Sequence, residues 1–330
     1  MRRSLALILS LAASACFAVA CASTSAASGS SSTRATVPMT FGIGNQHATM
    51  FDDPRWQSLG LKTTRVFVPW NAAADPKVLK WATDYVTQAR ANGVSVLVHV
   101  TGRARDGVAE PLPSNASYRK WVGRLIAALR PIGVEAWGVW NEANHATQPT
   151  ALHPGRAASY TRDLVSLCRG CTIVAADVLV QGGPTSVSIT SYRPWITKYL
   201  AALRPARTSR LLIGLHNYGD LIVGTSPDRT LDLIRVVRKT VPKARFWITE
   251  SGGIAASHTR TCDERRQVVG QRRMFAQAAK LAPFGVERLY AYSWTALDCT
   301  NRYDSGLIRP DGTARPALAI VQAWAPRFVG

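Results

Sequence analysis

The feature that most constrains the fold is a regular alternation of short apolar segments with longer amphipathic ones, starting at residue 37. The segment 94–100, VSVLVHV, is rich in β-branched residues and almost wholly apolar, which is typical of a strand covered on both faces. Strands of this kind belong to parallel sheets flanked by helices. The eight predicted strands are 37–44, 64–69, 94–100, 134–140, 172–180, 211–216, 245–249 and 288–292.

Helical segments separate these strands. The segment 75–92 starts with an Asp N-cap followed by proline and ends before glycine, which are the usual start and stop signals of a helix. The segment 118–129 places Trp121, Leu125 and Leu129 on one helical face. The other predicted helices are 155–167, 194–203, 228–239, 263–281 and 317–325.

Eight strands, each followed by a helix, predict a (β/α)8 barrel of class α/β that occupies residues 37–330 as a single domain. The rival architecture is a doubly wound sheet, but no glycine-rich dinucleotide turn follows the first predicted strand. In a barrel the reactive residues lie at the carboxyl ends of the strands, because the loops there form the concave face. Catalytic side chains are therefore expected at the strand ends.

The N-terminus is typical of an export signal. Two arginines are followed by an apolar stretch with small-residue cleavage sites, so residues 1–22 are predicted to be a signal peptide. Lipidation of Cys16 or Cys21 is the alternative, although alanine three residues before each cysteine is a poor lipobox match. Residues 23–36 are rich in Ser, Thr and Ala and predict a flexible tether. Within the chain, no apolar run reaches the length of a membrane span.

Export would bring the four remaining cysteines into an oxidising compartment, where disulfides form. Cys168 and Cys171 are close enough in sequence for a local bridge, and Cys262 would then pair with Cys299. Free buried thiols are the alternative for all four. Only one pair has ligand-like spacing, so neither a zinc site nor another metal site is expected.

The net charge is unusually positive. Forty Lys and Arg against twenty Asp and Glu leave +20, distributed along the chain, while 47% apolar residues exclude wholesale disorder. Acidic wall polymers, uronate glycans or anionic lipid headgroups would be attracted by this charge. The alternative is an arginine-rich composition with solvated side chains. Export and the lack of a recognisable nucleic-acid-binding fold argue against nucleic acid as a partner.

Two strand ends each present a carboxylate within an aromatic sequence. The fourth predicted strand runs into Asn141 and Glu142, and the seventh runs into Glu250. Because these two strands lie across the barrel mouth from one another, the carboxyl groups would face each other over a cleft. Cleavage of a glycosidic bond needs one neutral carboxyl to protonate the leaving oxygen and one carboxylate to attack carbon or activate water. The alternative is a pair of solvated surface glutamates.

These residues carry a family resemblance. The segments WNEAN at 140–144 and WITESGG at 247–253 resemble the two catalytic strands of glycoside hydrolase clan A, a (β/α)8-barrel group, and look closest to family 39 and family 5-like glycosidases. The ending SGLI at 305–308, followed by DG and RPA, resembles the close of these barrels. The likeness extends over 37–330, but the chain lacks the accessory β-sandwich common in family 39 β-xylosidases. The resemblance implies a retaining mechanism with Glu142 as acid/base and Glu250 as nucleophile.

The resemblance also implies a set of neighbours for the two glutamates. Arg65 and Tyr218 would favour the charged form of Glu250, and Asn141 would hydrogen-bond a sugar 2-hydroxyl. Trp294 would form the floor of the sugar subsite as an exposed aromatic platform. The candidate substrate-binding residues are Arg65, Asn141, His216, Tyr218, Trp294, Tyr292 and Trp70. Four histidine and aspartate residues near strand ends complete the set: His47 and His145 as further cleft candidates, and His99 and Asp177, which we interpret as structural.

The sequence thus predicts a secreted retaining O-glycosyl hydrolase of β-glycosidic bonds, acting on a poly- or oligosaccharide. We expect a monomer, without cofactor or catalytic metal, and with membrane attachment only through a lipid anchor. A catalytically silent carbohydrate-binding barrel at the cell surface is the alternative. An unrelated barrel enzyme, such as an oxidoreductase or metal hydrolase, is a third reading. Which sugar is cleaved depends on loops such as 102–117 and 251–263, whose shapes the sequence does not predict.

Overall fold

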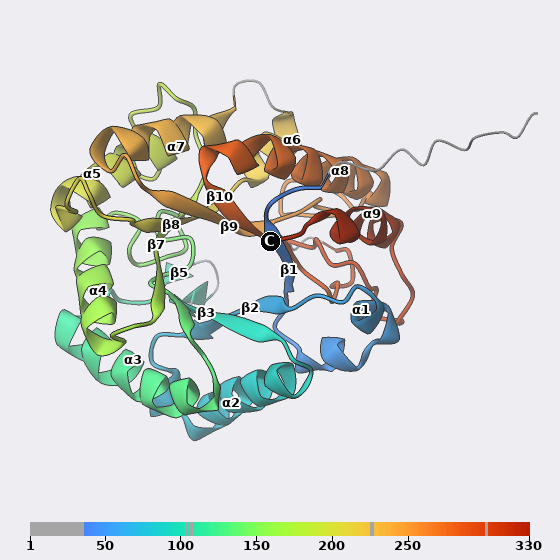
Figure 1. Cartoon of the computed structure of the whole chain (residues 1–330), viewed down its shortest axis with the longest axis horizontal. Helices are drawn as coiled ribbons and strands as arrows, with labels where there is room; N and C mark the ends of the chain where they lie inside the picture. Colours follow the sequence, from blue (N-terminus) through green and yellow to red (C-terminus); the bar gives the residue numbers. More distant parts are fainter. Residues whose placement is uncertain (1–35, 103, 106–107, 225–227, 301–302) are drawn as a thin grey trace, which may run out of the picture. The chain divides into compact units, whose positions relative to one another are not determined.

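Eight parallel strands surrounded by helices form the computed structural model of the chain (Figure 1). The structure describes residues 36–102, 104–105, 108–224, 228–300 and 303–330. The predicted signal peptide 1–22, with Cys16 and Cys21, and all but the last residue of the tether 23–36 lie outside the described residues. Export and lipidation therefore stay predictions.

The strands close into a barrel in the order β1-β10-β9-β8-β7-β6-β3-β2, and β2 pairs again with β1. This closed parallel barrel confirms the predicted (β/α)8 fold over the doubly wound sheet. The barrel strands are β1 (Thr40–Gly44), β2 (Thr63–Pro69), β3 (Ser95–Thr101), β6 (Ala136–Gly138), β7 (Thr172–Leu179), β8 (Leu212–His216), β9 (Arg245–Ser251) and β10 (Val286–Tyr292). Outside the barrel, β4 (Ala104–Arg105) and β5 (Val108–Ala109) pair as an antiparallel ribbon that the sequence did not predict.

Helices cover the outside of the barrel (Figure 1). They are α1 (Pro54–Ser58), α2 (Pro76–Ala91), α3 (Asn115–Leu129), α4 (Pro154–Leu167), α5 (Tyr192–Leu203), α6 (Tyr218–Val223), α7 (Arg229–Thr240), α8 (Glu264–Leu281) and α9 (Ala317–Trp324). The start of α2 is capped as its sequence predicts, because the Asp75 side chain accepts from the Lys77 and Val78 backbone N–H groups. Helices α1 and α6 were not predicted. Since α6 begins at Tyr218, this residue lies on a helix rather than on the strand assumed for it.

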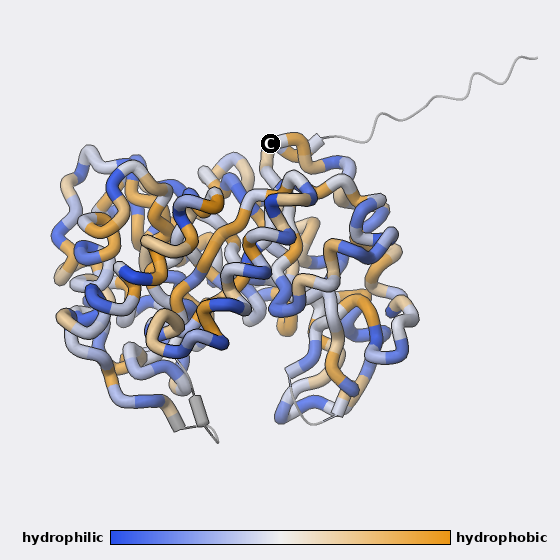
Figure 2. The backbone as a smooth tube through the Cα atoms, turned by 90° about the horizontal axis from the view of Figure 1, so that it is seen from below, coloured by the Kyte–Doolittle hydropathy of each residue, from blue (hydrophilic) through white to orange (hydrophobic). Residues whose placement is uncertain are grey.

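Two apolar layers hold the barrel together. The larger fills the space between strands and helices, and Figure 2 shows hydrophobic stretches mainly in the interior and hydrophilic ones mainly at the periphery. The smaller cluster comes from five barrel strands and forms an apolar floor inside the barrel: Leu97, Val174, Leu212, Trp247 and Tyr290. Among the described residues, no helix combines the length and apolar character that crossing a bilayer requires.

Candidate active site

A cavity of about 480 Å³ opens at the carboxyl ends of the strands and contains both predicted catalytic glutamates. Glu142 follows β6 and Glu250 lies near the end of β9. One carboxylate oxygen of each and a ring nitrogen of His216 lie within 4.8 Å of one another. The residues that line the cavity are Phe67, Asn141, Glu142, His145, Leu179, Tyr218, Glu250, Ile254, Ser257, His258, Thr259, Tyr292 and Tyr303. The volume is typical of a small-molecule site.

Arg65 on β2 holds Glu250 from below. Its side chain is 1% exposed, and Nη1 donates to Glu250 Oε2 at 2.7 Å. The same side chain donates from Nη2 to Asn141 Oδ1 and from Nε to His99 Nδ1, the latter at 3.1 Å. Burial acts to lower the pKa of Arg65, but the carboxylates of Glu250 and Asp177 raise it above its ordinary value. Arg65 is therefore a fixed positive charge that orients Glu250 and Asn141 together.

Tyr218 supplies the second hydrogen bond to Glu250, because its Oη donates to Oε1 at 3.1 Å. Burial, and then the nearby charge of Glu250, raise the pKa of Tyr218 well above its usual range, so the phenol keeps its proton. Both carboxylate oxygens of Glu250 thus accept from a protein donor. This arrangement suits a carboxylate that attacks through a fixed oxygen rather than one that gives up a proton.

Glu142 has a different environment, because its partner is a histidine. Oε1 of Glu142 lies 3.1 Å from His216 Nδ1. Burial acts to lower the pKa of His216, but the carboxylates of Asp177 and Glu250 raise it to about 10. Burial acts to raise the pKa of Glu142, whereas the hydrogen bond and the charge of His216 lower it below its ordinary value. At neutral pH the proton therefore resides on His216, next to an ionised Glu142.

Asp177 is the anionic centre of the buried layer beneath the glutamates. Its carboxylate is 0% exposed, and Oδ2 lies 3.1 Å from His216 Nε2 and 3.3 Å from His99 Nε2. Arg65 Nη2 lies 3.4 Å from the same oxygen, and Thr249 Oγ1 donates to the other. Burial acts to raise the pKa of Asp177, and these neighbours hold it far below its usual range. Burial also lowers the pKa of His99 to about 3, so His99 is neutral at physiological pH.

The backbone is strained where this layer meets the mouth. Glu142 has φ +46° and Asp177 has φ +55°, in the left-handed region that non-glycine residues seldom adopt. Asp177 is the extra residue of a bulge in β7 against β8, between Ala176 and Val178. The Glu142 N–H donates to Asp177 Oδ2 at 3.4 Å. A strained backbone persists only where the surrounding structure enforces it, and such positions cluster at functional sites.

Two barrel glycines make room for the buried layer. A Cβ on Gly138 in β6 would lie 1.9 Å from Cδ2 of His99. A Cβ on Gly214 in β8 would lie 2.4 Å from Oδ1 of Asp177. Both distances are far below a van der Waals contact, so the packing of His99 and Asp177 depends on glycine at these positions.

The aromatic platform differs from the predicted one. Trp294 is 2% exposed, packs in the outer core and hydrogen-bonds to Asp53, so the expectation of an exposed tryptophan was wrong. The reason is that β10 ends at Tyr292, so the strand alternation linking the two residues does not reach Trp294. Trp70 is half-buried and donates to Glu110 Oε1 at 2.6 Å, and it is not a cavity-lining residue. Aromatic surface in the cavity comes from Tyr292, which was predicted, and from Phe67, which was not, with ring centroids 5.6 Å apart.

Several lining residues were not predicted. Ser257, His258 and Thr259 come from the loop after β9, and Tyr303 comes from the loop after β10. The first three lie in the segment 251–263, which the sequence predicts only as a loop without indicating its shape. Of the two further histidine candidates, His145 lines the cavity and His47 does not.

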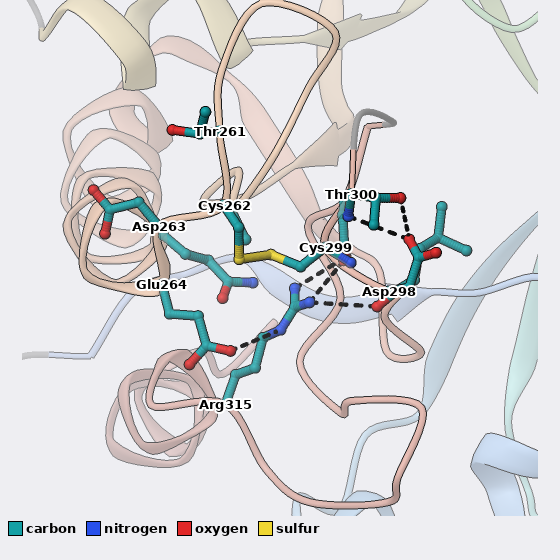
Figure 3. The surroundings of a disulfide bond; sticks show 12 residues. Thr261, Cys262, Asp263, Glu264, Asp298, Cys299, Thr300 and Arg315 are labelled. Carbon is teal, nitrogen blue, oxygen red and sulfur yellow. Dashed lines mark hydrogen bonds and ion pairs between the residues drawn. A yellow bond between two sulfur atoms is a disulfide. The ribbon is translucent and has the colours of Figure 1, made fainter.

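The structure pairs all four described cysteines. Cys168 bonds to Cys171 between α4 and β7, with Cα atoms 5.5 Å apart. Cys262 bonds to Cys299 and so joins the loop after β9 to the loop after β10 (Figure 3). These are the pairs that the spacing suggested. The Cα distances are normal for disulfides.

Glu142, His216 and Glu250 are also the group of described donors that lie close enough together to surround a metal ion. Positive charge is already present there, since Arg65 donates to Glu250 Oε2 and the proton on His216 faces Glu142. The donor set therefore suits proton transfer and nucleophilic attack better than metal ligation.

Searches against protein-family models and against curated proteins found no match to this sequence. Solved structures do match its fold. An endo-β-1,4-glucanase from Xanthomonas axonopodis pv. citri aligns at TM-score 0.59 and 16% identity, covering 88% of this chain and 100% of that one. An exo-β-1,4-mannosidase from Opitutaceae bacterium strain TAV5 aligns at TM-score 0.59 and 15% identity, covering 87% and 59%.

A third match is a GH128 endo-β-1,3-glucanase from Amycolatopsis mediterranei in complex with laminaripentaose. It aligns at TM-score 0.52 and 19% identity, covering 87% of this chain and 99% of that one. At these identities the likeness shows that the chain shares the (β/α)8 fold of these carbohydrate-active enzymes. This is the fold that the resemblance to clan A implied.

Proposed function

We propose that this protein is a retaining O-glycosyl hydrolase acting on β-linked poly- or oligosaccharides. The observation that carries the proposal is the approach of the Glu142 and Glu250 carboxylates, within 4.8 Å in one cavity. Retaining enzymes hold their two carboxyl groups about 5–5.5 Å apart, whereas inverting enzymes need about 6.5–9.5 Å to admit a water. The enzymes named among the structural matches act on β-linked glucans and mannosides, which supports a β-glycosidic substrate.

In the first half of the proposed reaction, Glu250 attacks the anomeric carbon while its oxygens are held by Arg65 and Tyr218. The bond to the leaving oxygen breaks, and Glu142 gives that oxygen a proton. In the second half, Glu142 takes a proton from water, the hydroxide oxygen bonds to the anomeric carbon, and the bond to Glu250 breaks. The sugar leaves with its original configuration after two displacements.

The proton that Glu142 must deliver resides on His216 in the free site, 3.1 Å away. When a sugar displaces water from the cavity, the neutral pair of Glu142 and His216 becomes favoured over the ion pair, because desolvation penalises separated charges. Transfer of the proton along this hydrogen bond then converts Glu142 into the acid. Asn141, held by Arg65 and lining the cavity, is placed to hydrogen-bond the sugar 2-hydroxyl.

We also propose that the enzyme is secreted. The signal-like segment 1–22 is supported by two disulfides, which persist in oxidising compartments. Attachment through Cys16 or Cys21 is the lipoprotein variant of the same proposal. Comparing the mass of the mature protein in medium and membrane fractions distinguishes the two.

The test is turnover of a panel of aryl β-glycosides by wild type and by Glu142→Gln and Glu250→Gln. We expect measurable turnover by wild type and a loss of at least about 10³-fold in each variant. Proton NMR of the first sugar released identifies its anomer, and retention of the β configuration is expected. Sugar binding without turnover by wild type would instead identify the silent carbohydrate-binding barrel, and inverted product would exclude Glu250 as nucleophile.

A further inference from the structure

One wall of the cavity is built by loops rather than by the barrel. Ser257, His258 and Thr259 lie in the loop between β9 and α8, and Tyr303 lies in the loop between β10 and α9. The backbones of Ser257 and Arg260 exchange two hydrogen bonds of 3.0 Å, which closes a tight turn with His258 and Thr259 at its tip. We call these four lining residues the loop wall.

The two loops are joined along their backbones. Asp304 N donates to Ala256 O at 2.9 Å, and Ala255 N donates to Asp304 O at 2.8 Å, as in an antiparallel bridge. The residues next to this bridge are the ones that face the cavity, Ser257 on one loop and Tyr303 on the other. Movement of either loop would therefore move both sides of the wall.

A covalent bond and a buried ion pair hold the bridge in place, and Figure 3 shows the disulfide together with Arg315. Cys262 is bonded to Cys299, and Cys299 N donates to Asp304 Oδ2 at 3.1 Å. Arg315 donates to both oxygens of Asp304, at 2.9 and 2.7 Å, and each of the two side chains is only 1% exposed. The guanidinium also lies 3.3 Å from Glu264, the first residue of α8. This set forms a clasp between the two loops and the outer helices.

The loop wall reaches the nucleophile through aromatic side chains. The Tyr303 ring packs edge-on against Tyr218, with centroids 5.6 Å apart, and Tyr218 donates to Glu250. The Tyr303 hydroxyl is buried, which raises its pKa well above the usual range, so it stays a hydrogen-bond donor. Ser257, His258 and Thr259 add hydroxyl and imidazole groups, which suit the hydroxyl groups of a sugar.

We propose that the loop wall is a sugar-selecting surface of the cavity. We also propose that the Cys262–Cys299 disulfide, as part of the clasp, preorganises the wall for binding. The inference rests on the proposed function. A loop that is ordered before the ligand arrives does not have to be ordered on binding, so affinity rises without any new contact. Removing the disulfide should thus weaken sugar binding much more than it slows the chemistry, because both glutamates stand on barrel strand ends and the wall is linked to Glu250 indirectly, through Tyr303 and Tyr218.

The test compares Cys262→Ala/Cys299→Ala with Cys168→Ala/Cys171→Ala, a matched control that removes the disulfide between α4 and β7. For the clasp variant we expect KM to rise about 10-fold and kcat to stay within about threefold of wild type. The control should keep both constants. Unchanged KM in the clasp variant, or a loss confined to kcat, would overturn the inference.

If the clasp variant fails to fold, a second pair of variants tests the same proposal. Tyr303→Phe and His258→Ala leave the disulfide intact, and each should change the relative kcat/KM for cello-, manno- and laminari-oligosaccharides by at least about fivefold. Equal losses for all three sugars would mean that the wall does not select. Calorimetric binding of the same oligosaccharides to Glu250→Gln separates the two proposals. If the loop-wall substitutions weaken binding but the wild-type protein has no turnover, only the hydrolase function is refuted. If the wild-type protein turns over substrate and the substitutions leave binding unaffected, only the present inference is refuted.

Discussion

Oδ2 of Asp177 lies 3.1 Å from Nε2 of His216, and both side chains are fully buried. The other nitrogen of the same ring lies 3.1 Å from Glu142. One imidazole therefore connects a permanently ionised carboxylate to the carboxyl group that must exchange a proton. Because Asp177 raises the pKa of His216, it determines indirectly where that proton resides in the free site.

Replacing Asp177 by Asn should destabilise the fold by about 3 kcal/mol, because Arg65 and His216 lose the fully buried carboxylate that they share. Urea unfolding measures this loss, and an NMR titration should show the pKa of His216 falling from about 10. The matched control is Asp84→Asn, which breaks an exposed pair with Lys80 and should cost less than about 1 kcal/mol. Equal effects of the two substitutions would contradict the role given to Asp177.

The His216→Asn variant should narrow the pH range of activity. In wild type the pair of Glu142 and His216 holds its proton until the pH approaches about 10, whereas the variant keeps only the proton of Glu142. The alkaline limb of kcat/KM should therefore move to lower pH. An aryl glycoside whose leaving group needs no proton is the control, and its profile should lack this shift. A variant with an unmoved alkaline limb would disprove the shared proton.

Stability should also depend on pH in a defined window. The pKa of His216 is raised from 6.5 to about 10 on folding, so its contribution is complete below pH 6.5 and is lost as the pH rises towards 10. His99 has the opposite sign, because its pKa is lowered to about 3, and it destabilises the fold as the pH falls below 6.5. The midpoint temperature of thermal unfolding should consequently be highest near neutral pH. Without the imidazole, His216→Asn should lose the decline between pH 7 and 10.

Gly138→Ala should disrupt the buried layer, because its Cβ would lie 1.9 Å from the His99 ring. We expect a loss of stability of about 1–3 kcal/mol and a fall in kcat, since displacement of His99 also removes the hydrogen bond from Arg65 Nε. Gly155→Ala, in α4, is the control, because its Cβ would make an ordinary 3.8 Å contact with Ala202. That variant should be neutral or slightly more stable. Calorimetry of both proteins decides the point.

The barrel could be predicted because its strands are buried on both faces and helix caps mark the intervening segments. The segment 94–100 differs from β3 by one residue at each end, and the cap at Asp75 forms as expected. Glu142 and Glu250 could be placed for the same reason, because a strand end is a defined position in this fold. These inferences needed only local pattern and topology.

Asp177 could not be recognised as a member of the site, because its role depends on a bulge within an apolar run. Without that extra residue, strand alternation gives no reason to place the carboxylate beneath His216. The prediction for Trp294 was wrong for a related reason, because β10 ends two residues before Trp294 and the strand alternation therefore does not apply to it. The loop wall arises from contacts between segments about forty residues apart, which no local pattern encodes.

The apolar floor under the charged layer has a consequence for proton traffic. Leu97, Trp247 and Tyr290 lie beneath the layer, and His216 itself is fully buried, so a proton passes between its imidazole and the cavity through Glu142. A bound substrate would cover Glu142 and so separate the pair of Glu142 and His216 from bulk water during the first half-reaction. The pair would exchange protons with bulk water only before substrate enters and after the leaving group departs, when water has access to the cavity.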